Sequence, residues 1–447
     1  MSNTISDKPP IGVIGAGWVG LVTATCFAEL GHEVVVREIV QDKVDVLSRG
    51  DLTIHEPDLP ELLRKNLDHM TFTTDMGELL DRTRLMFVCV DTPPTYSGDA
   101  DLSRVQTVVS EVGDSTEHAL IMKSTVPVGT GSAIRRDKHD LAYVSCPEFL
   151  KEGTAVADFM HPDRVVVGSD EGDWAGDAVE AIYRPLGGEM VRTDIASAEM
   201  IKLASNAFLA TKISFINEIA NVCEEVGADV TEVAKGMGLD ERIGSKFLQA
   251  GIGYGGSCFP KDVTALKQLA GNSGYHFQLL NAVIEVNELQ KRRVIGKLKK
   301  HLGDNLVGKK IALLGLSFKP HTDDMREASS LVLSSRLRGE GAEVTAFDPV
   351  ASERAAELLP GVVIRDNPLA ALEGADAAVI VTEWPEFAEL DLAAVRNTMA
   401  TPLIIDGRNL LDGESVAAAG FAYEGVGRPA LGGNAEPTAV AASAAAE

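Results

Sequence analysis

A dozen residues in the second half of the chain, Gly251–Asp262 (GIGYGGSCFPKD), bring glycines, a cysteine, a lysine and an aspartate together. Glycines at this density let the backbone adopt positive φ angles or approach a ligand closely. Cys258 lies just before Lys261 and Asp262, ahead of a segment with helical periodicity. A thiol attacks as its thiolate, which a cationic neighbour or a helix N-terminus favours. The segment predicts a catalytic cysteine, the alternative being a glycine-rich turn around an inert buried thiol.

A dinucleotide-binding pattern stands near the start of the chain. An apolar segment runs into GAGWVG, and a helical stretch and a second apolar segment ending at Glu38 follow. In this context Gly15 makes the tight turn, Gly17 admits a pyrophosphate and Gly20 lets the helix pack on the strand. Glu38 is placed to bind ribose hydroxyls and to repel a 2′-phosphate, so NAD is expected rather than NADP. Arg37 should point away from the site, because side chains alternate along a strand.

Further polar residues follow the later strands of this first α/β half. Thr92 follows residues 83–90, Thr125 follows a strand beginning near 118, and Glu148 and Glu152 follow a strand that breaks at a proline. Ligands of open parallel sheets lie beyond the carboxyl ends of the strands, so these residues are placed for contact. In an apolar setting, burial could raise the pKa of the Glu148 carboxyl toward a value useful for an acid or base. The alternatives are helix caps or turns for the threonines and a solvated loop carboxylate for Glu148.

A long helix is predicted over residues 196–226, where apolar residues recur at helical spacing without Pro or Gly. Such a helix links domains or forms a subunit interface. Lys202 and Asn206 are four residues apart and share one face, where they could polarise a substrate oxygen. The alternative is an ordinary surface lysine beside an unrelated asparagine.

A second α/β unit begins near residue 308. Its first turn, GLSFKP, lacks GxGxxG, so it need not hold a dinucleotide pyrophosphate in the usual way. Lys319, Arg326 and Arg408 fall at or near strand ends, where they could bind a phosphorylated ligand, unless they are ordinary surface cations. The expected organisation is an NAD-binding domain over 8–196, a helical dimerisation region over 197–302, a nucleotide-sugar domain over 303–428 and a disordered tail over 429–447.

Composition narrows the class of protein. The chain has 447 residues, 45% hydrophobic residues, 24% charged residues and a formal net charge of −25. This predicts a soluble protein of two or three domains, and the charge opposes nucleic acid or an anionic membrane as partner. No secretory signal or membrane span is evident. Five scattered cysteines favour the cytoplasm and suggest no metal site.

Seven motifs in order resemble the UDP-glucose/GDP-mannose dehydrogenase family: GAGWVG, STVPVGT, PEFLKEG, KLASNAFLATKISFINE, GYGGSCFPKD, GLSFKP with DDMREA, and DGRN. The resemblance covers the chain up to about Arg428. It implies an α/β fold of two Rossmann-like domains joined by a long central helix that forms a homodimer or higher oligomer. It also implies NAD-dependent four-electron oxidation of a nucleotide-sugar at C6, with a thiohemiacetal and then a thioester on Cys258.

The resemblance assigns roles to individual residues. The implied catalytic residues are Cys258, Lys202, Asn206, Asp262, Glu148 and Thr125. The implied cofactor-binding residues are Gly15, Gly17, Trp18, Val19, Gly20, Glu38, Lys43, Thr92, Thr125, Glu152, Lys261 and Arg326. The implied substrate-binding residues are Glu148, Phe149, Leu150, Lys151, Lys202, Asn206, Arg242, Phe247, Gly255, Phe318, Lys319 and Arg408. Arg242 is implied to reach the substrate of a neighbouring subunit.

Three positions depart from the family pattern. Glu38 stands where aspartate is common, Asp91 where a neutral residue is usual, and Gln249 where a basic residue is frequent. Asp91 close to cofactor phosphates would be electrostatically awkward, so its orientation is open.

Within the family that the chain resembles, the motif GYGGSCFPKD implies UDP-glucose as substrate over GDP-mannose or UDP-N-acetyl sugars, with dTDP-glucose as a close alternative. Two other classes stay open. A catalytically silent nucleotide-binding protein would be expected to lack at least one of Lys202, Asn206, Cys258 and Asp262. A two-electron 3-hydroxyacid dehydrogenase would need neither the cysteine nor the second α/β half.

Overall fold

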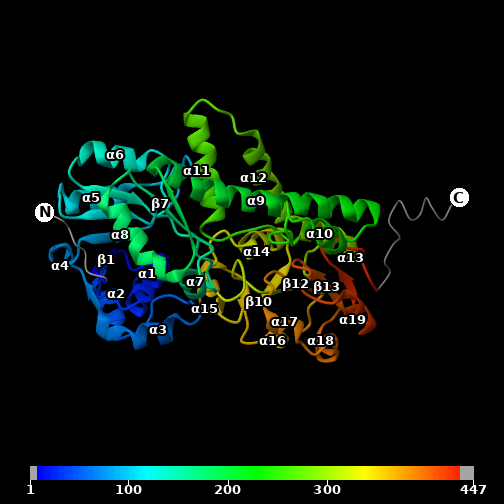
Figure 1. Ribbon diagram of the computed structural model, residues 1–447. Helices are drawn as coiled ribbons and strands as arrows, with labels where there is room; N and C mark the ends of the chain where they lie inside the picture. The colour runs from blue at the N-terminus through cyan, green and yellow to red at the C-terminus, as the bar shows by residue number, and fades with distance from the viewer. Residues whose placement is uncertain (1–7, 433–447) are drawn as a thin grey trace. The chain divides into compact units, whose positions relative to one another are not determined.

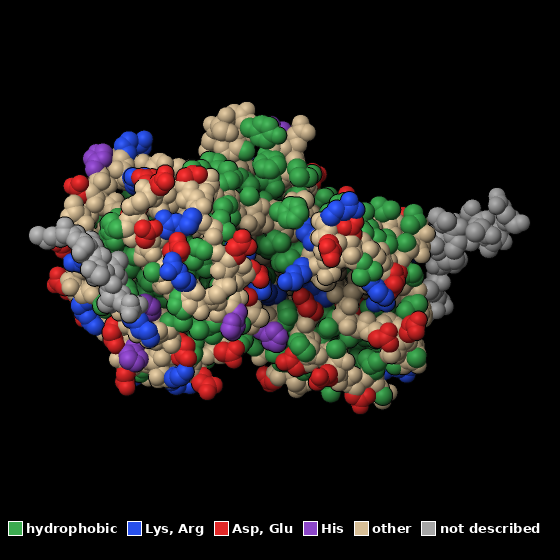
Figure 2. Space-filling view, viewed as in Figure 1, with side chains coloured by type: hydrophobic (Ala, Val, Ile, Leu, Met, Phe, Trp, Pro, Cys, Tyr) green, Lys and Arg blue, Asp and Glu red, His purple; other side chains and the backbone are tan. Residues whose placement is uncertain are grey.

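The structure, a computed structural model, describes residues 8–432 (Figure 1). It contains two compact units. The first comprises the residues up to Asn206 together with Thr264–His276, and the second comprises Ala207–Val263 together with the residues from Phe277 onward. Within the described part of the chain, no helix is both long and apolar enough to cross a membrane. On the face shown in Figure 2, acidic and basic side chains are interspersed.

The first unit is built on an eight-stranded sheet in the order β3-β2-β1-β4-β5-β6-β7-β8. The first six positions follow the order of a dinucleotide-binding Rossmann sheet. All neighbouring pairs are parallel except β6 with β7, which are antiparallel. The strands are β1 (Ile11–Ile14), β2 (Val34–Arg37), β3 (Met70–Thr73), β4 (Leu85–Val88), β5 (Ala119–Met122), β6 (Ala142–Ser145), β7 (Arg164–Gly168) and β8 (Glu189–Thr193).

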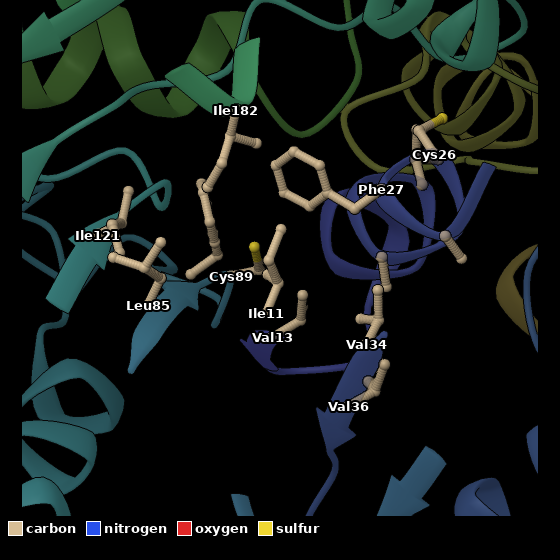
Figure 3. Close-up of a cluster of buried hydrophobic side chains, with 14 of the residues drawn as sticks. Ile11, Val13, Cys26, Phe27, Val34, Val36, Leu85, Cys89, Ile121 and Ile182 are labelled. Atoms are coloured by element: carbon tan, nitrogen blue, oxygen red, sulfur yellow. The ribbon is translucent and has the colours of Figure 1, made fainter. Parts of the chain in front are cut away.

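Apolar side chains on the strands pack against α1, whose Phe27 lies over Ile11, Val13 and Val34 (Figure 3). The strands read as continuous apolar runs because helices cover both faces of a parallel sheet. The helices of this unit are α1 (Trp18–Glu29), α2 (Gln41–Ser48), α3 (Leu59–Lys65), α4 (Met76–Arg82), α5 (Ser103–Val112), α6 (Thr130–Asp137), α7 (Ala155–Met160) and α8 (Trp174–Tyr183), with 3-10 turns η1 (Leu67–His69) and η2 (Arg184–Leu186).

The predicted long helix is confirmed as α9 (Ile195–Val226). Lys202, Leu203, Asn206 and Ala210 are buried, as the helical spacing requires. The division between the two compact units falls inside this helix, between Asn206 and Ala207.

The second unit contains a six-stranded parallel sheet in the order β11-β10-β9-β12-β13-β14, the same Rossmann-like order as the first. The expected α/β fold of two Rossmann-like domains joined by a long helix is thus confirmed. The strands are β9 (Lys310–Leu314), β10 (Glu343–Phe347), β11 (Val363–Ile364), β12 (Ala377–Ile380), β13 (Leu403–Asp406) and β14 (Ala422–Glu424).

The remaining helices pack around this sheet or precede it in the chain. They are α10 (Val230–Gly238), α11 (Phe259–Asn272), α12 (Gln278–Gln290), α13 (Arg293–Leu302), α14 (Ser329–Gly339), α15 (Ser352–Leu358), α16 (Pro368–Leu372), α17 (Pro385–Ala388), α18 (Leu392–Thr398) and α19 (Gly413–Ala418). Leu431 pairs with Tyr423 in an antiparallel bridge. Most of the expected disordered tail, residues 433–447, lies outside the described residues.

A buried carboxylate closes the first turn of the second sheet. Asp348, directly after β10, accepts hydrogen bonds from the backbone N–H groups of Leu316 (2.7 Å) and Ser317 (3.0 Å) and from the indole of Trp384 (3.1 Å). In a dinucleotide-binding domain a carboxylate at this place binds the ribose. Here the Asp348 oxygens accept hydrogen bonds from the chain itself, and the turn GLSFKP lacks GxGxxG.

Candidate functional site

The glycine turn after β1 has the geometry that its sequence predicts. Gly15 has a φ of +101°, which favours glycine. A Cβ at Gly20 would lie 1.8 Å from the carbonyl oxygen of Gly15, so only glycine lets α1 start this close to β1. A Cβ at Gly17 would meet no atom within 4 Å. The turn therefore leaves room at Gly17 for a ligand, and the residues fit a dinucleotide.

Glu38 directly follows β2 and is buried at the carboxyl end of that strand. Its carboxylate accepts hydrogen bonds from the N–H groups of Ala16 (3.3 Å) and Val40 (3.1 Å). Arg37 is directed elsewhere, forming a 3.0 Å ion pair with Glu111, as strand alternation predicts. The aliphatic Ile39 that follows is 69% exposed and was not singled out from the sequence. A ribose acceptor followed by an exposed apolar side chain suits an adenosine.

Two further cofactor candidates lie nearby in the sequence. Val19 is half-buried in the first turn of α1, and Lys43 is half-buried in the first turn of α2.

Trp18 is connected to a buried carboxylate that the sequence did not reveal. Glu56 accepts hydrogen bonds from the Trp18 indole (2.8 Å) and from the N–H groups of Gly153 (2.8 Å) and Ala155 (2.9 Å). It thereby connects the glycine turn with the segment that contains Glu152, which is half-buried. Glu56 stands among turn residues (IHEPDL), where no periodicity marks a buried position.

Thr92 and Thr125 meet at the ends of β4 and β5. The Thr92 hydroxyl donates to the carbonyl oxygen of Thr125 (2.8 Å). The neighbouring Asp91 is exposed and accepts a 2.8 Å hydrogen bond from Arg104. The charge at this unusual position is therefore paired at the surface.

A buried ion pair lies beyond β6. Lys202 of α9 donates a 2.8 Å hydrogen bond to Glu148, and both side chains are only about one-twentieth exposed, at 5% and 6%. Burial acts to raise the pKa of Glu148, but the charge and hydrogen bond of Lys202, the N–H of Leu150 and the charge of Lys123 outweigh it and lower the pKa. Glu148 is therefore an anion at neutral pH, and its pKa is lowered, not raised as the sequence predicts. Asn206 is buried one turn further along α9.

The residues Phe149 and Leu150, which follow Glu148, contact the Glu148–Lys202 ion pair. The Leu150 N–H donates to Glu148 (2.6 Å), and the Lys202 ammonium lies 5.4 Å from the ring centre of Phe149. Lys151 is different, because its side chain is largely exposed and pairs with Asp158 at 2.9 Å.

Cys258 directly precedes α11, as predicted, and the Asp262 N–H donates to its carbonyl oxygen (2.8 Å). It is exposed, whereas the other four cysteines are buried. Burial raises the pKa of Cys26 and of Cys89 to about 12. Lys261 pairs with the buried Asp262 at 2.6 Å. The sequence segment thus places one accessible thiol at a helix N-terminus, where an anion is stabilised.

Three buried amide side chains hold the glycine-rich loop before Cys258. Asn217 accepts from the Gly251 N–H (2.8 Å), and Gln290 donates to the Gly251 carbonyl (3.0 Å). Asn287 both accepts from the N–H of Tyr254 (2.8 Å) and donates to its carbonyl (3.1 Å). These amides lie on α9 and α12, where amides in helical patterns carry no distinctive sequence signal.

The glycine-rich loop before Cys258 packs against the candidate residues that follow the strands of the second sheet. Arg408 donates to the carbonyl oxygens of Gly253 (2.9 Å) and Val381 (2.8 Å). A Cβ at Gly255 would lie 2.4 Å from the carbonyl oxygen of Glu327, so this glycine is required for close packing. The other positions here are Phe318, half-buried beside Gly256, Lys319, whose ammonium is 5.3 Å from the Phe318 ring centre, and Arg326, which pairs with Asp324 at 2.7 Å.

Two candidates, Arg242 and Phe247, and one departure from the family pattern, Gln249, precede the loop. Arg242 is 88% exposed and binds Asp240 of its own chain (3.0 Å). Phe247 has a φ of +64°, a conformation that is costly for a bulky residue and that clusters at functional sites. Gln249 is exposed.

The structure thus assembles two groups of candidates. The first unit brings together the glycine turn, Glu38, the two threonines and the Glu148–Lys202 pair. The second unit brings together the Cys258 loop, Phe318, Lys319 and Arg408. Within residues 8–432, no three His, Cys, Asp or Glu side chains are arranged to hold a metal ion.

Comparison with known proteins finds three domains of one family along the chain. Sequence signatures of the UDP-glucose/GDP-mannose dehydrogenase family match its NAD binding domain at residues 10–187, its central domain at 196–289 and its UDP binding domain at 312–413. UDP-glucose 6-dehydrogenase TuaD of Bacillus subtilis is 45% identical, with 96% of this chain and 95% of that protein aligned.

Two solved structures are similar over 94% of the chain. A UDP-glucose dehydrogenase from Pyrobaculum islandicum has a TM-score of 0.87, 35% identity and 98% coverage of its own chain. A UDP-D-ManNAc dehydrogenase from Pyrococcus horikoshii has a TM-score of 0.83, 28% identity and 99% coverage of its own chain.

Proposed function

Because the chain belongs to the UDP-glucose/GDP-mannose dehydrogenase family, we propose that it is an NAD-dependent UDP-glucose 6-dehydrogenase, which oxidises the sugar C6 alcohol to a carboxylate. The relatives named UDP-glucose 6-dehydrogenase support this substrate. The observation that carries the chemistry is the accessible Cys258 thiol at the start of α11, while the other cysteines are buried.

NAD, when bound, accepts hydride in both oxidations, and the residues proposed to hold it are Gly15, Gly17, Trp18, Val19, Gly20, Glu38, Lys43, Thr92, Thr125, Glu152, Lys261 and Arg326. Oxidation of the alcohol gives an aldehyde. The Cys258 sulfur then bonds to C6, and the oxygen takes a proton to give a thiohemiacetal. Loss of the second hydride and of the proton gives a thioester. Water bonds to C6, the C–S bond breaks and the thiol is restored with the uronate.

Lys202 and Asn206 are proposed to stabilise the oxyanion on C6, which is strongest where water is excluded. Glu148, held as an anion, Thr125 and Asp262 are proposed to position water and protons. The proposed contacts to the nucleotide-sugar are Glu148, Phe149, Leu150, Lys151, Lys202, Asn206, Arg242, Phe247, Gly255, Phe318, Lys319 and Arg408.

The deciding experiment measures NADH formed per nucleotide-sugar consumed, with UDP-glucose, dTDP-glucose, GDP-mannose and UDP-N-acetyl sugars in parallel. Two NADH per UDP-glucose, with UDP-glucose the best substrate, is the expected result. One NADH per sugar would contradict the thioester route. Higher specificity for dTDP-glucose than for UDP-glucose would contradict the assignment of UDP-glucose as the substrate. Binding without turnover would favour a silent nucleotide-binding protein.

A homodimer and a cytoplasmic location are also proposed. Phe208, Phe215, Val222 and Val226 are about half exposed or more along one helix, at 65%, 48%, 56% and 51%. Hydrophobic side chains gather over α9 and α12 in Figure 2. A second copy would cover this stripe, and Phe215→Asp should shift the mass measured by light scattering to that of one chain. The free buried thiols suit a reducing compartment.

A further inference from the structure

Arg164 lies beside the catalytic segment although it is 15 residues away in sequence. It begins β7, which is antiparallel to β6 and pairs with it at Ser145 and Gly168. Continuing that register, each step forward along one strand is a step back along the other. Phe149, four residues after Ser145, then stands opposite Arg164, four residues before Gly168. The reversal of β7 thus brings Arg164 to the edge where Glu148 lies.

Side-chain contacts confirm this placement. The central carbon of the Arg164 guanidinium lies 3.7 Å from the ring centre of Phe149. The Lys202 ammonium lies 5.4 Å from the same ring centre and 2.8 Å from Glu148. The ring of Phe149 therefore connects Arg164 to the buried ion pair.

The chemistry of these contacts is suited to positioning. A flat guanidinium stacks on an aromatic ring over a wide area, which the compact ammonium of a lysine does not. Arg164 is half-buried and, among residues 8–432, makes no hydrogen bond and no ion pair, although the charge of the neighbouring Asp163 acts on it. The stack on Phe149 is therefore its closest side-chain contact.

We propose that Arg164 is a positioning residue for the oxidation: its guanidinium fixes the ring of Phe149, and the ring in turn keeps the Lys202 ammonium on Glu148 and directed at the sugar oxygen. The inference rests on the proposed function, because Lys202 has this task only if the chain oxidises a sugar alcohol.

The test compares Arg164→Met and Arg164→Lys with Arg192→Met. Arg192 is a control on the neighbouring β8, where it pairs with Asp177 (3.3 Å) and Glu180 (3.6 Å). We expect kcat with UDP-glucose to fall about tenfold in Arg164→Met and less in Arg164→Lys, in keeping with loss of a desolvated cation–π contact. KM for UDP-glucose should change less than twofold, and Arg192→Met should match the wild type.

Two readouts separate positioning from general stability. In Arg164→Met the acid limb of the kcat profile should move to higher pH. A looser Lys202 weakens the largest contribution that opposes burial at Glu148, so that the Leu150 N–H and the charge of Lys123 alone act against burial to lower its pKa. In a Phe149→Leu background, Arg164→Met should cause no further loss of kcat, because it acts through that ring.

The inference would be overturned if the Phe149→Leu/Arg164→Met double variant lost kcat by the product of the two single losses. It would also be overturned if Arg164→Met kept the wild-type kcat and pH profile. If Arg164→Met does not fold, wild-type kcat and pH profile in Arg164→Lys would overturn it in the same way. A failure of the proposed function looks different, since the wild-type chain itself would then give no NADH from UDP-glucose.

Discussion

Lys202 and Glu148 form a buried 2.8 Å ion pair although 54 residues separate them in the sequence. Removing Glu148 deprives the buried Lys202 ammonium of this hydrogen-bonded partner. We expect Glu148→Gln to lower kcat by about 10² because a positioned acid–base group is lost. Steady-state kinetics at pH 7 measure this, with Glu340→Gln at the surface as control. Unchanged kcat would remove Glu148 from the mechanism.

The same pair makes a prediction about pH. Because the folded pKa of Glu148 lies below its ordinary value of 4.5, its stabilising contribution is complete above that value and is lost as the pH falls through the folded pKa. The difference in free energy of unfolding between wild type and Glu148→Gln should therefore be constant from pH 7 to pH 5 and shrink below pH 4.5. Urea titrations at several pH values measure it, and a difference that grows on acidification would contradict the assignment.

Cys258→Ser should abolish the second oxidation. A serine oxygen is a far weaker nucleophile toward the aldehyde than a thiolate, so NADH release should fall by at least about 10²-fold. The control is Cys223→Ser, which alters a buried thiol away from the reaction. Iodoacetamide applied to the native protein should modify Cys258 and spare the other four. Wild-type NADH production by Cys258→Ser would refute the thioester route.

Two glycines of the same turn should respond differently to alanine. Gly17→Ala places its methyl group in open space, so the melting temperature should stay near that of the wild type while the Kd for NAD rises about tenfold or more. Gly20→Ala forces a Cβ to within 1.8 Å of a backbone oxygen and should unfold at a clearly lower temperature. Calorimetry and NAD titration of both variants test this. Equal melting temperatures would show that the turn is wider than described.

A buried charge cluster in the second unit predicts a stability effect. Glu424 accepts hydrogen bonds from Lys297 (2.9 Å) and His301 (2.8 Å). Burial raises its pKa, but these partners and Lys300 lower it to about 2. Glu424→Gln should destabilise the protein by about 1–3 kcal/mol at pH 7, because the buried Lys297 then keeps only Glu224 (2.6 Å) as its ion-pair partner. This stabilisation is present above the ordinary value of 4.5 and is lost as the pH falls toward 2. Glu340→Gln, beside the more exposed Lys299, should cost less than about 1 kcal/mol in the same urea titrations.

The sequence predicted the parts of the fold that local patterns encode. GAGWVG between apolar runs predicted the turn, and apolar spacing predicted α9 to within one residue. It did not reveal Glu56 or the amides Asn287 and Gln290, because a buried polar residue is recognised by its partners and those are distant in sequence. The pKa of Glu148 was misjudged for the same reason, since the compensating cation comes from α9.

The glycine turn after β1 has a consequence for the order of events in the proposed reaction. The two Rossmann-like halves are alike in strand order, but the first turn of the second half, GLSFKP, lacks GxGxxG. If both oxidations use the turn after β1, the two NAD molecules of one cycle bind there in succession. In the proposed route, the half-oxidised sugar is held by its bond to Cys258 while the first cofactor leaves and the second arrives.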